Sequence, residues 1–217
     1  MTRRILLSLA LSTVLAGSAL ADDLTPPPWR FNAGTTVQHW DFSSGPTGFA
    51  PDALPLNNSY GSPAMIPAGG ATWLPAFSGR NDVWDITAGA LNFDIPNVGM
   101  PTHQKDLWLQ VTFFGLAPVI NPAIVVASSS GANFNLVGGP FNTILPNGWV
   151  HQLTQWNLPV CPQLEHVTIS PGFAGAPMVI DQVVIDTQCI IPSPAAASLL
   201  GLGSLTALRR RRRTALS

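Results

Sequence analysis

Charged side chains are scarce in this chain of 217 residues, and only 10% of its residues are Asp, Glu, Lys or Arg. Between residues 22 and 191 the only cations are Arg30, Arg80 and Lys105, whereas all 11 carboxylates of the chain lie there. These 3 cations and 11 carboxylates leave the segment with a formal net charge of −8. Because phosphates require cationic partners, this balance argues against a nucleic-acid ligand.

Glutamate is almost absent, since Glu165 is the only one. A pair of catalytic glutamates for glycoside hydrolysis is therefore excluded. The chain has four histidines, which are His39, His103, His151 and His166. They follow none of the spacings of zinc proteases, and the segment Gly172–Gly175 resembles neither a phosphate-binding loop nor a nucleophile elbow. We predict that the protein is not an enzyme, and keep a polysaccharide-acting hydrolase as the less favoured alternative.

Cysteine occurs only twice, as Cys161 and Cys189. Two cysteines in an exported protein usually form one disulfide, and we expect that pairing here. The bond would close a loop of about 29 residues, which corresponds to roughly 3–4 kcal/mol of stabilisation. A catalytic thiol is a weaker alternative, and a two-cysteine metal site would need histidines at ligand spacing.

The first 21 residues have the three parts of a secretory signal peptide. A positively charged start precedes the apolar run Ile5–Leu15, and Ala19 and Ala21 match a small-residue cleavage site. We therefore expect export, with residues 1–21 removed.

The last 26 residues, 192–217, hold a second targeting pattern. The pattern begins with Pro192, Ser193 and Pro194, continues with the uncharged run Ala195–Leu208, and ends with Arg209, Arg210, Arg211, Arg212 and Arg213. As a helix, Ile190–Leu208 would reach about 28 Å, close to the hydrocarbon thickness of a bilayer. The arginines should stay cytoplasmic and act as a membrane stop. This order of parts indicates a short C-terminal transmembrane helix.

The tail resembles the PEP-CTERM class of bacterial sorting signals, which are processed by membrane proteases called exosortases. The resemblance implies recognition at Pro192, Ser193 and Pro194, and transient anchoring of an extracytoplasmic domain. Ser193 stands where the family usually has Glu. The implied partner is an exosortase-type protease, and the implied location is the membrane, with release to the cell surface or the extracellular matrix.

Residues 22–191 are long enough for one domain, which we expect to be all-β: an antiparallel β-sandwich of jelly-roll type. Short runs of β-branched and aromatic residues recur between Pro, Gly and Asn. The predicted strands are Thr36–Phe42, Val83–Ile86, Ala90–Ile95, Leu107–Gly115, Ala123–Ala127, Phe134–Val137, Trp149–Trp156, His166–Ser170 and Met178–Thr187. The segment Gly45–Gly79 shows no obvious strand and is expected to be a long loop. A right-handed β-helix is the main rival, but no repeat of fixed period supports it.

Two of these runs alternate clearly enough to assign faces. The odd-numbered residues of Leu107–Phe113 are all apolar, so we expect them to share one face. Strict alternation likewise places the odd-numbered residues of Val179–Ile185 on one face and the even-numbered residues on the other.

Three short segments resemble bacterial lectin-like and carbohydrate-binding sandwiches of the galactose-binding-like type. They are His39–Phe42, Gly148–Leu153 and Val179–Ile185, and they resemble that family's opening strand, the strand that often precedes its final hairpin, and its closing strand, in that order. The resemblance implies that the closing strand packs beside the opening strand. It also implies a structural Ca²⁺ between Asp41 and Asp181, although Gln182 replaces the usual Asp or Asn after the second acid.

The seven tryptophans of the chain suggest a ligand. Sugars stack on exposed aromatic faces beside amides and carboxylates. The candidates are Trp73, Trp84, Trp108 and Trp156, which equally well fill a core. The favoured hypothesis is a non-catalytic surface module that binds an extracellular polysaccharide. The alternative is a structural envelope or matrix protein without a small ligand.

Overall fold

The computed structural model describes residues 22–52, 56–115 and 119–191. The predicted signal peptide (residues 1–21) and sorting signal (residues 192–217) lie outside these residues. In the described part of the chain, no helix is long and apolar enough to cross a membrane.

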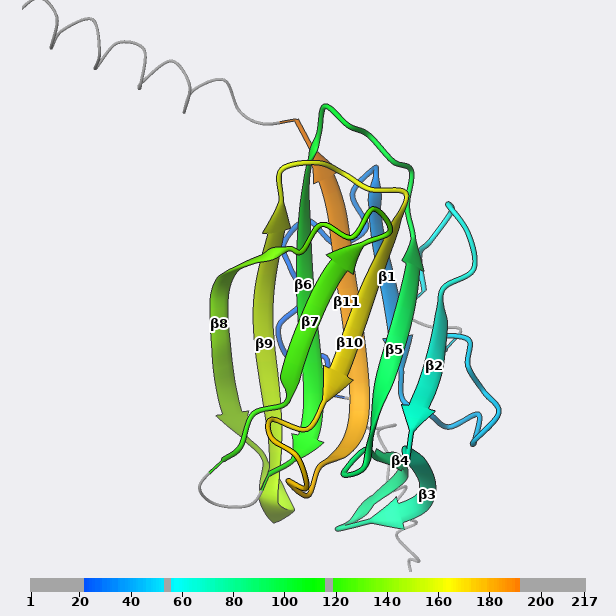
Figure 1. Cartoon of the computed structure of the whole chain (residues 1–217), viewed down its shortest axis with the longest axis vertical. Helices are drawn as coiled ribbons and strands as arrows, with labels where there is room; N and C mark the ends of the chain where they lie inside the picture. The colour runs from blue at the N-terminus through cyan, green and yellow to red at the C-terminus, as the bar shows by residue number, and fades with distance from the viewer. Residues whose placement is uncertain (1–21, 53–55, 116–118, 192–217) are drawn as a thin grey trace, which may run out of the picture.

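Two antiparallel sheets pack face to face as a β-sandwich, as predicted (Figure 1). The larger sheet contains seven strands: β3 (Thr72–Phe77), β4 (Arg80–Asp85), β11 (Val179–Ile190), β6 (Gln104–Phe114), β9 (Trp149–Leu158), β8 (Asn135–Ile144) and, beside β11, β1 (Thr35–Trp40). The smaller sheet contains β2 (Ala64–Gly69), β5 (Gly89–Pro96), β10 (Leu164–Ser170) and β7 (Ala123–Ser128). A 3-10 turn, η1 (Pro146–Gly148), precedes β9.

Strand β11 organises the larger sheet. It pairs with β6 along its whole length, with β4 at Val179 and Ile180, and with β1 from Val183 onward. The opening and closing strands are therefore neighbours, as the resemblance implied.

The alternation predicted for β6 is confirmed, because Leu107, Leu109, Val111 and Phe113 are fully buried between the sheets. The alternation predicted for β11 is wrong at its start. The register shifts between Ile180 and Gln182, so Ile180 joins Val183 and Ile185 in the core. A β-bulge of this kind adds one residue and reverses the faces of the residues before it.

The segment Gly45–Gly79 is not a strandless loop, because it contains β2 and β3. Each is an edge strand of its sheet, and each contains a proline, Pro67 in β2 and Pro75 in β3. Proline is tolerated at a sheet edge, where its missing N–H breaks no ladder.

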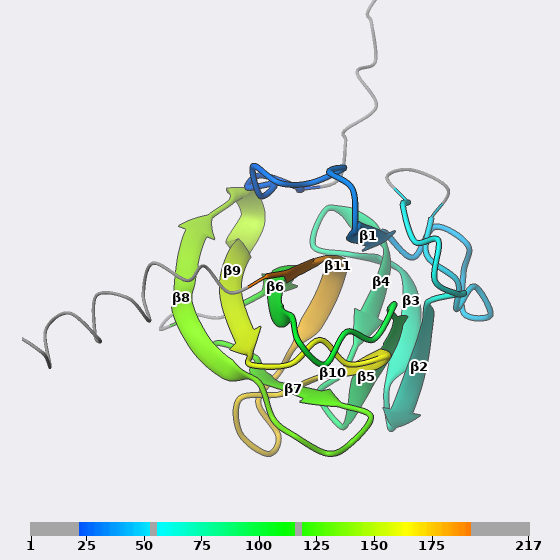
Figure 2. The same ribbon diagram turned by 90° about the horizontal axis from the view of Figure 1, so that it is seen from above.

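The outer face of the larger sheet is covered by residues 22–30, which we call the N-terminal strap. Figure 2 shows this segment in dark blue, along the outer side of the sheet and leading into β1. Thr25 N donates to Gln110 Oε1 over 2.9 Å, and the rings of Trp29 and Trp108 meet edge to face at 6.2 Å. The strap thus buries polar groups on a face that a sandwich would otherwise leave in water.

Candidate functional site

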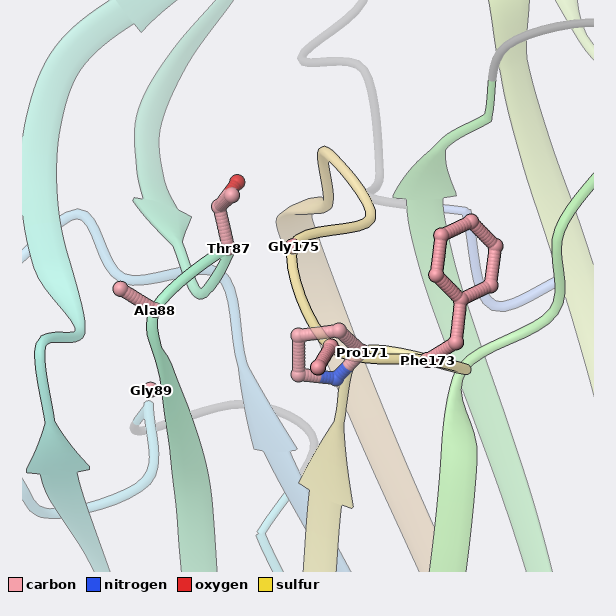
Figure 3. A pocket seen from close by; sticks show the side chains of 7 residues that line it. Thr87, Ala88, Gly89, Pro171, Phe173 and Gly175 are labelled. Atoms are coloured by element: carbon pink, nitrogen blue, oxygen red, sulfur yellow. The ribbon is translucent and has the colours of Figure 1, made fainter.

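A shallow pocket of about 300 Å³ lies at one end of the sandwich, between the β4–β5 and β10–β11 connections (Figure 3). Its lining consists of Thr87, Ala88, Gly89, Pro171, Phe173, Ala174 and Gly175. None of these side chains carries a charge.

Hydrogen bonds fix both walls of the pocket. On one side Asp85 Oδ1 accepts from Thr87 N over 2.9 Å, and Thr87 Oγ1 accepts from Met178 N over 3.1 Å. On the other side Ala176 N donates to Phe173 O over 3.1 Å, and Gly175 has a φ of 79° that favours glycine. This turn leaves Phe173 56% exposed.

The pocket offers binding groups rather than acid–base groups. An aromatic ring and a hydroxyl can contact neutral polar molecules such as sugars. The backbone amides of Thr87 and Gly89 already donate within the protein, to Asp85 Oδ1 and Ile86 O. Phe173 lies in the segment Gly172–Gly175 but was not among the predicted binding residues. The sequence signal that could have found it is an aromatic residue between Gly172 and Gly175, in a segment between two predicted strands.

The four predicted tryptophans do not share one surface. Trp73 and Trp84 are cross-strand partners on β3 and β4, and Trp84 is only 3% exposed in the core. Trp156 packs against the same core from β9, where its Nε1 donates to Thr154 Oγ1 over 2.9 Å. Trp108 faces the other way and lies under the strap against Trp29. Their role in ligand binding stays a prediction.

The two aspartates of the predicted calcium site already have partners in the protein. Asp41 Oδ1 accepts from Ser43 N over 2.9 Å, and an Asp181 oxygen lies 2.5 Å from Arg80 Nη1. Burial raises the pKa of Asp181 to about 6, against the opposing effect of Arg80. In the described segments, no group of three or more His, Cys, Asp or Glu side chains is placed to hold a metal ion. Calcium binding stays a prediction.

All three cations of residues 22–191 are engaged in ion pairs. Arg30 binds Asp186 at 2.6 Å and also Asp23, whereas Arg80 binds Asp22 and Asp181. Both arginines thus fasten the N-terminal strap to the larger sheet. The third cation, Lys105, pairs with Glu165 at 3.1 Å inside the core.

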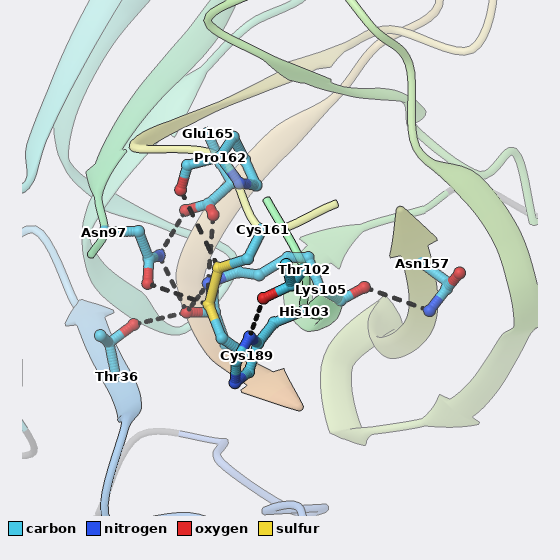
Figure 4. The surroundings of a disulfide bond; sticks show 11 residues. Thr36, Asn97, Thr102, His103, Lys105, Asn157, Cys161, Pro162, Glu165 and Cys189 are labelled. Carbon is cyan, nitrogen blue, oxygen red and sulfur yellow. Dashed lines mark hydrogen bonds and ion pairs between the residues drawn. A yellow bond between two sulfur atoms is a disulfide. The ribbon is translucent and has the colours of Figure 1, made fainter. Parts of the chain in front are cut away.

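The predicted disulfide is confirmed. Cys161, in the loop between β9 and β10, is bonded to Cys189 near the end of β11, with their Cα atoms 5.8 Å apart (Figure 4). Because β10 runs from this loop to Pro171, the disulfide lies at the opposite end of the sandwich from the pocket.

No protein-family model matches the sequence, and no curated protein matches it. Three solved structures are similar in part. An exo-β-1,3-galactanase from Phanerochaete chrysosporium is 15% identical with a TM-score of 0.36, and the match covers 56% of this chain but only 27% of that one. The C-terminal CBM6 of a marine laminarinase from Zobellia galactanivorans is 9% identical with a TM-score of 0.31, over 56% and 98% of the two chains. A protein of unknown function from Shewanella oneidensis is 12% identical with a TM-score of 0.37, over 73% and 89%. At these values the similarity assigns no function to this chain.

Proposed function

We propose that this protein is an exported, non-catalytic β-sandwich module that binds a neutral carbohydrate of the cell surface or extracellular matrix. The observation that carries the proposal is the uncharged pocket beside Phe173. Sugars present C–H-rich faces that stack on aromatic rings, and hydroxyls that pair with polar groups. A volume of about 300 Å³ is at the lower end for ligand pockets and fits one sugar ring or a chain end.

The surroundings of the pocket support binding without catalysis. General acid–base catalysis needs a titratable group within hydrogen-bond reach of the reacting atom. The lining residues contain none. Asp85, the carboxylate next to the pocket in sequence, holds the backbone of Thr87 instead.

Export is supported by the disulfide. Such bonds persist in oxidising compartments and are rare in the cytosol. Exosortase processing at Pro192, Ser193 and Pro194 belongs to the same proposal, with the membrane as the first destination.

A second candidate function is a structural matrix protein without a small ligand. The observation that favours it lies on β8, an edge strand of the larger sheet. Four of its apolar side chains are exposed: Leu136, Val137, Phe141 and Ile144. Exposed apolar edge strands are ready sites of contact with another chain.

Two phenylalanine substitutions separate these functions. Phe173 and Phe141 are matched in exposure, at 56% and 57%, but only Phe173 lines the pocket. We expect Phe173→Ala to weaken binding to a neutral polysaccharide by roughly tenfold, since one aromatic contact is lost. Phe141→Ala should leave this binding unchanged. The measurement is isothermal titration calorimetry with a panel of neutral oligosaccharides and the polysaccharide extracted from the native host.

Two results would contradict carbohydrate binding at the pocket. One is a Phe173→Ala variant that binds as tightly as the wild type. The other is a loss of binding in Phe141→Ala alone, which would move the binding surface to β8.

A further inference from the structure

The only lysine and the only glutamate of the chain lie side by side in the core, near the disulfide (Figure 4). Both side chains are 0% exposed, and Lys105 Nζ lies 3.1 Å from Glu165 Oε1. Lys105 comes from β6 in the larger sheet and Glu165 from β10 in the smaller sheet. The pair therefore crosses the interior from one sheet to the other.

A carboxamide completes this cluster. Asn97 directly follows β5 and is 7% exposed, and its Nδ2 donates to Glu165 Oε2 over 2.7 Å. Lys105 Nζ and Asn97 Nδ2 also share the hydroxyl of Thr187, at 2.8 and 3.2 Å. One carboxylate and one hydroxyl thus hold the amine and the carboxamide together.

The stability of the fold does not explain this arrangement. A buried ion pair is often no more stabilising than apolar residues of the same volume, because both charges lose their hydration. The amine of Lys105 and the carboxamide of Asn97 each contact the same two groups, the carboxylate of Glu165 and the hydroxyl of Thr187. An amine, a carboxyl group and a carboxamide gathered in this way are the nucleophile, proton carrier and electrophile of an acyl transfer.

We propose that Lys105 and Asn97 join in an intramolecular isopeptide bond, formed by the folded protein itself with Glu165 as proton carrier. Lys105 Nζ attacks Asn97 Cγ, so that the Nζ–Cγ bond forms and the Cγ–Nδ2 bond breaks. Glu165, as the neutral acid, donates its proton to Nδ2, which leaves as ammonia, and then takes one proton from the attacking amine, so that the acid is regenerated. The reaction needs no oxidant, cofactor or second substrate.

Burial favours the reactive protonation states. It lowers the pKa of Lys105 to about 8, against the attraction of Glu165. It also raises the pKa of Glu165, against the attraction of Lys105 and the hydrogen bond from Asn97. A neutral amine is the nucleophile, and a neutral carboxylic acid can donate a proton.

The amide of Asn97 can assist in either orientation. Its Oδ1 lies 4.0 Å from Cys189 Sγ, a weak partner. Oxygen and nitrogen of a side-chain amide are assigned from their contacts, and a flip would direct Oδ1 at Glu165. The protonated acid would then donate to the carbonyl oxygen and polarise the carbon that Lys105 attacks.

The proposal is independent of carbohydrate binding, since the cluster lies at the other end of the sandwich from the pocket. The isopeptide bond would tie the end of β5 to the start of β6, and so link the two sheets covalently beside the disulfide.

The test measures how many free amines the protein has. Because Lys105 is the only lysine, its ε-amine is the only side-chain amine that can be labelled. The full-length protein is purified from an oxidising compartment, reduced, unfolded and treated with an amine-specific dimethylating reagent. We expect label on the α-amine alone, and an intact mass that is lower by one ammonia, about 17 Da. A wild-type chain that takes label on Lys105 would overturn the proposal.

Variants assign the roles in this reaction. Asn97→Ala removes the electrophile and Glu165→Gln the proton carrier, so Lys105 should be labelled in both, with folding checked by circular dichroism. Asn157→Ala is the matched control, because Asn157 Nδ2 contacts the backbone oxygen of Lys105 at 3.2 Å rather than its amine. This control should keep Lys105 blocked. Succinimide formation at Asn147, before Gly148, also releases ammonia, but it leaves the lysine free for labelling.

Discussion

At the scale of single residues, His151 is a buried group without full polar support. It lies on β9 under the strap, is 2% exposed, and has its Nδ1 3.4 Å from Thr112 Oγ1. Its Nε2 has no hydrogen-bond partner within the part of the chain that the structure describes. Burial lowers the pKa of His151, although Asp22 and Asp23 attract the charged form.

This pKa predicts a loss of stability in acid. Below about pH 6.5 the unfolded chain protonates this histidine while the folded chain does not, so the unfolded state binds more protons. The free energy of unfolding should therefore fall as the pH drops through 6.5, by at most about 1.4 kcal/mol per pH unit. The measurement is urea denaturation of the wild type and His151→Gln between pH 7.5 and 5.

The comparison with His151→Gln is needed because two buried aspartates change the pH dependence of stability in the opposite direction. Burial raises the pKa of both Asp181 and Asp186 to about 6. Between their unfolded pKa of 3.8 and about 6 the folded state binds more protons, so their contribution to stability grows as the pH falls. Both proteins keep these aspartates, so the difference between the two curves isolates His151. A difference that stays constant with pH would contradict the assignment.

At the scale of elements, the strap depends on Arg30. The Arg30 side chain is 8% exposed and that of Asp186 is 0% exposed. Arg30→Met would leave the buried carboxylate without its cation, and we expect this to lower the free energy of unfolding by about 3–5 kcal/mol. Arg80→Met is the matched control, because Arg80 is 22% exposed and its partner Asp181 is 11% exposed.

Chemical denaturation of the two variants checks this prediction. The loss in Arg80→Met should be clearly smaller, and adding Asp186→Asn to Arg30→Met should recover part of the stability. If the free energy of unfolding fell by the same amount in both single variants, the burial of the carboxylate would not determine how much stability is lost.

The strands show how far sequence reasoning reaches. All nine predicted strands are present. They were predictable because runs such as Leu107–Phe113 combine β-branched and aromatic residues with strict alternation. The two strands that it missed each contain a proline, which normally argues against a strand. The bulge after Ile180 was also invisible, since no glycine or proline marks it.

The sites were less predictable than the strands. The disulfide followed from two cysteines and the expectation of export. The core cluster joins Lys105 of β6, Glu165 of β10 and Asn97, which follows β5, so only register and sheet packing bring them together. The sequence shows that the chain has one lysine and one glutamate, but it does not show that the two side chains are in contact. The predicted tryptophans include Trp84, which the core needs, and composition alone cannot separate such residues from binding residues.

At the scale of the whole molecule, the predicted targeting signals at residues 1–21 and 192–217 bear on where the protein acts. We expect the mature protein to begin at Asp22 and to end near Pro192–Pro194. Intact-mass measurement on membrane and released fractions from the native host checks both ends. A mature chain that retains Arg209–Arg213 would contradict processing and leave a simple membrane anchor.

The positions of the pocket and the disulfide have a mechanical consequence. The chain leaves the sandwich at Ile191, just after Cys189, whereas the pocket lies at the far end of β11. A ligand held at the pocket and a tether at Ile191 would load the sandwich along its strands. The hydrogen bonds between β11 and its neighbours β1 and β6 would then resist in shear, together rather than one after another. The disulfide would pass part of the tension to the β9–β10 loop. We therefore expect the sandwich to resist a force along β11 better than the same force applied across the strand, which would break its hydrogen bonds one after another.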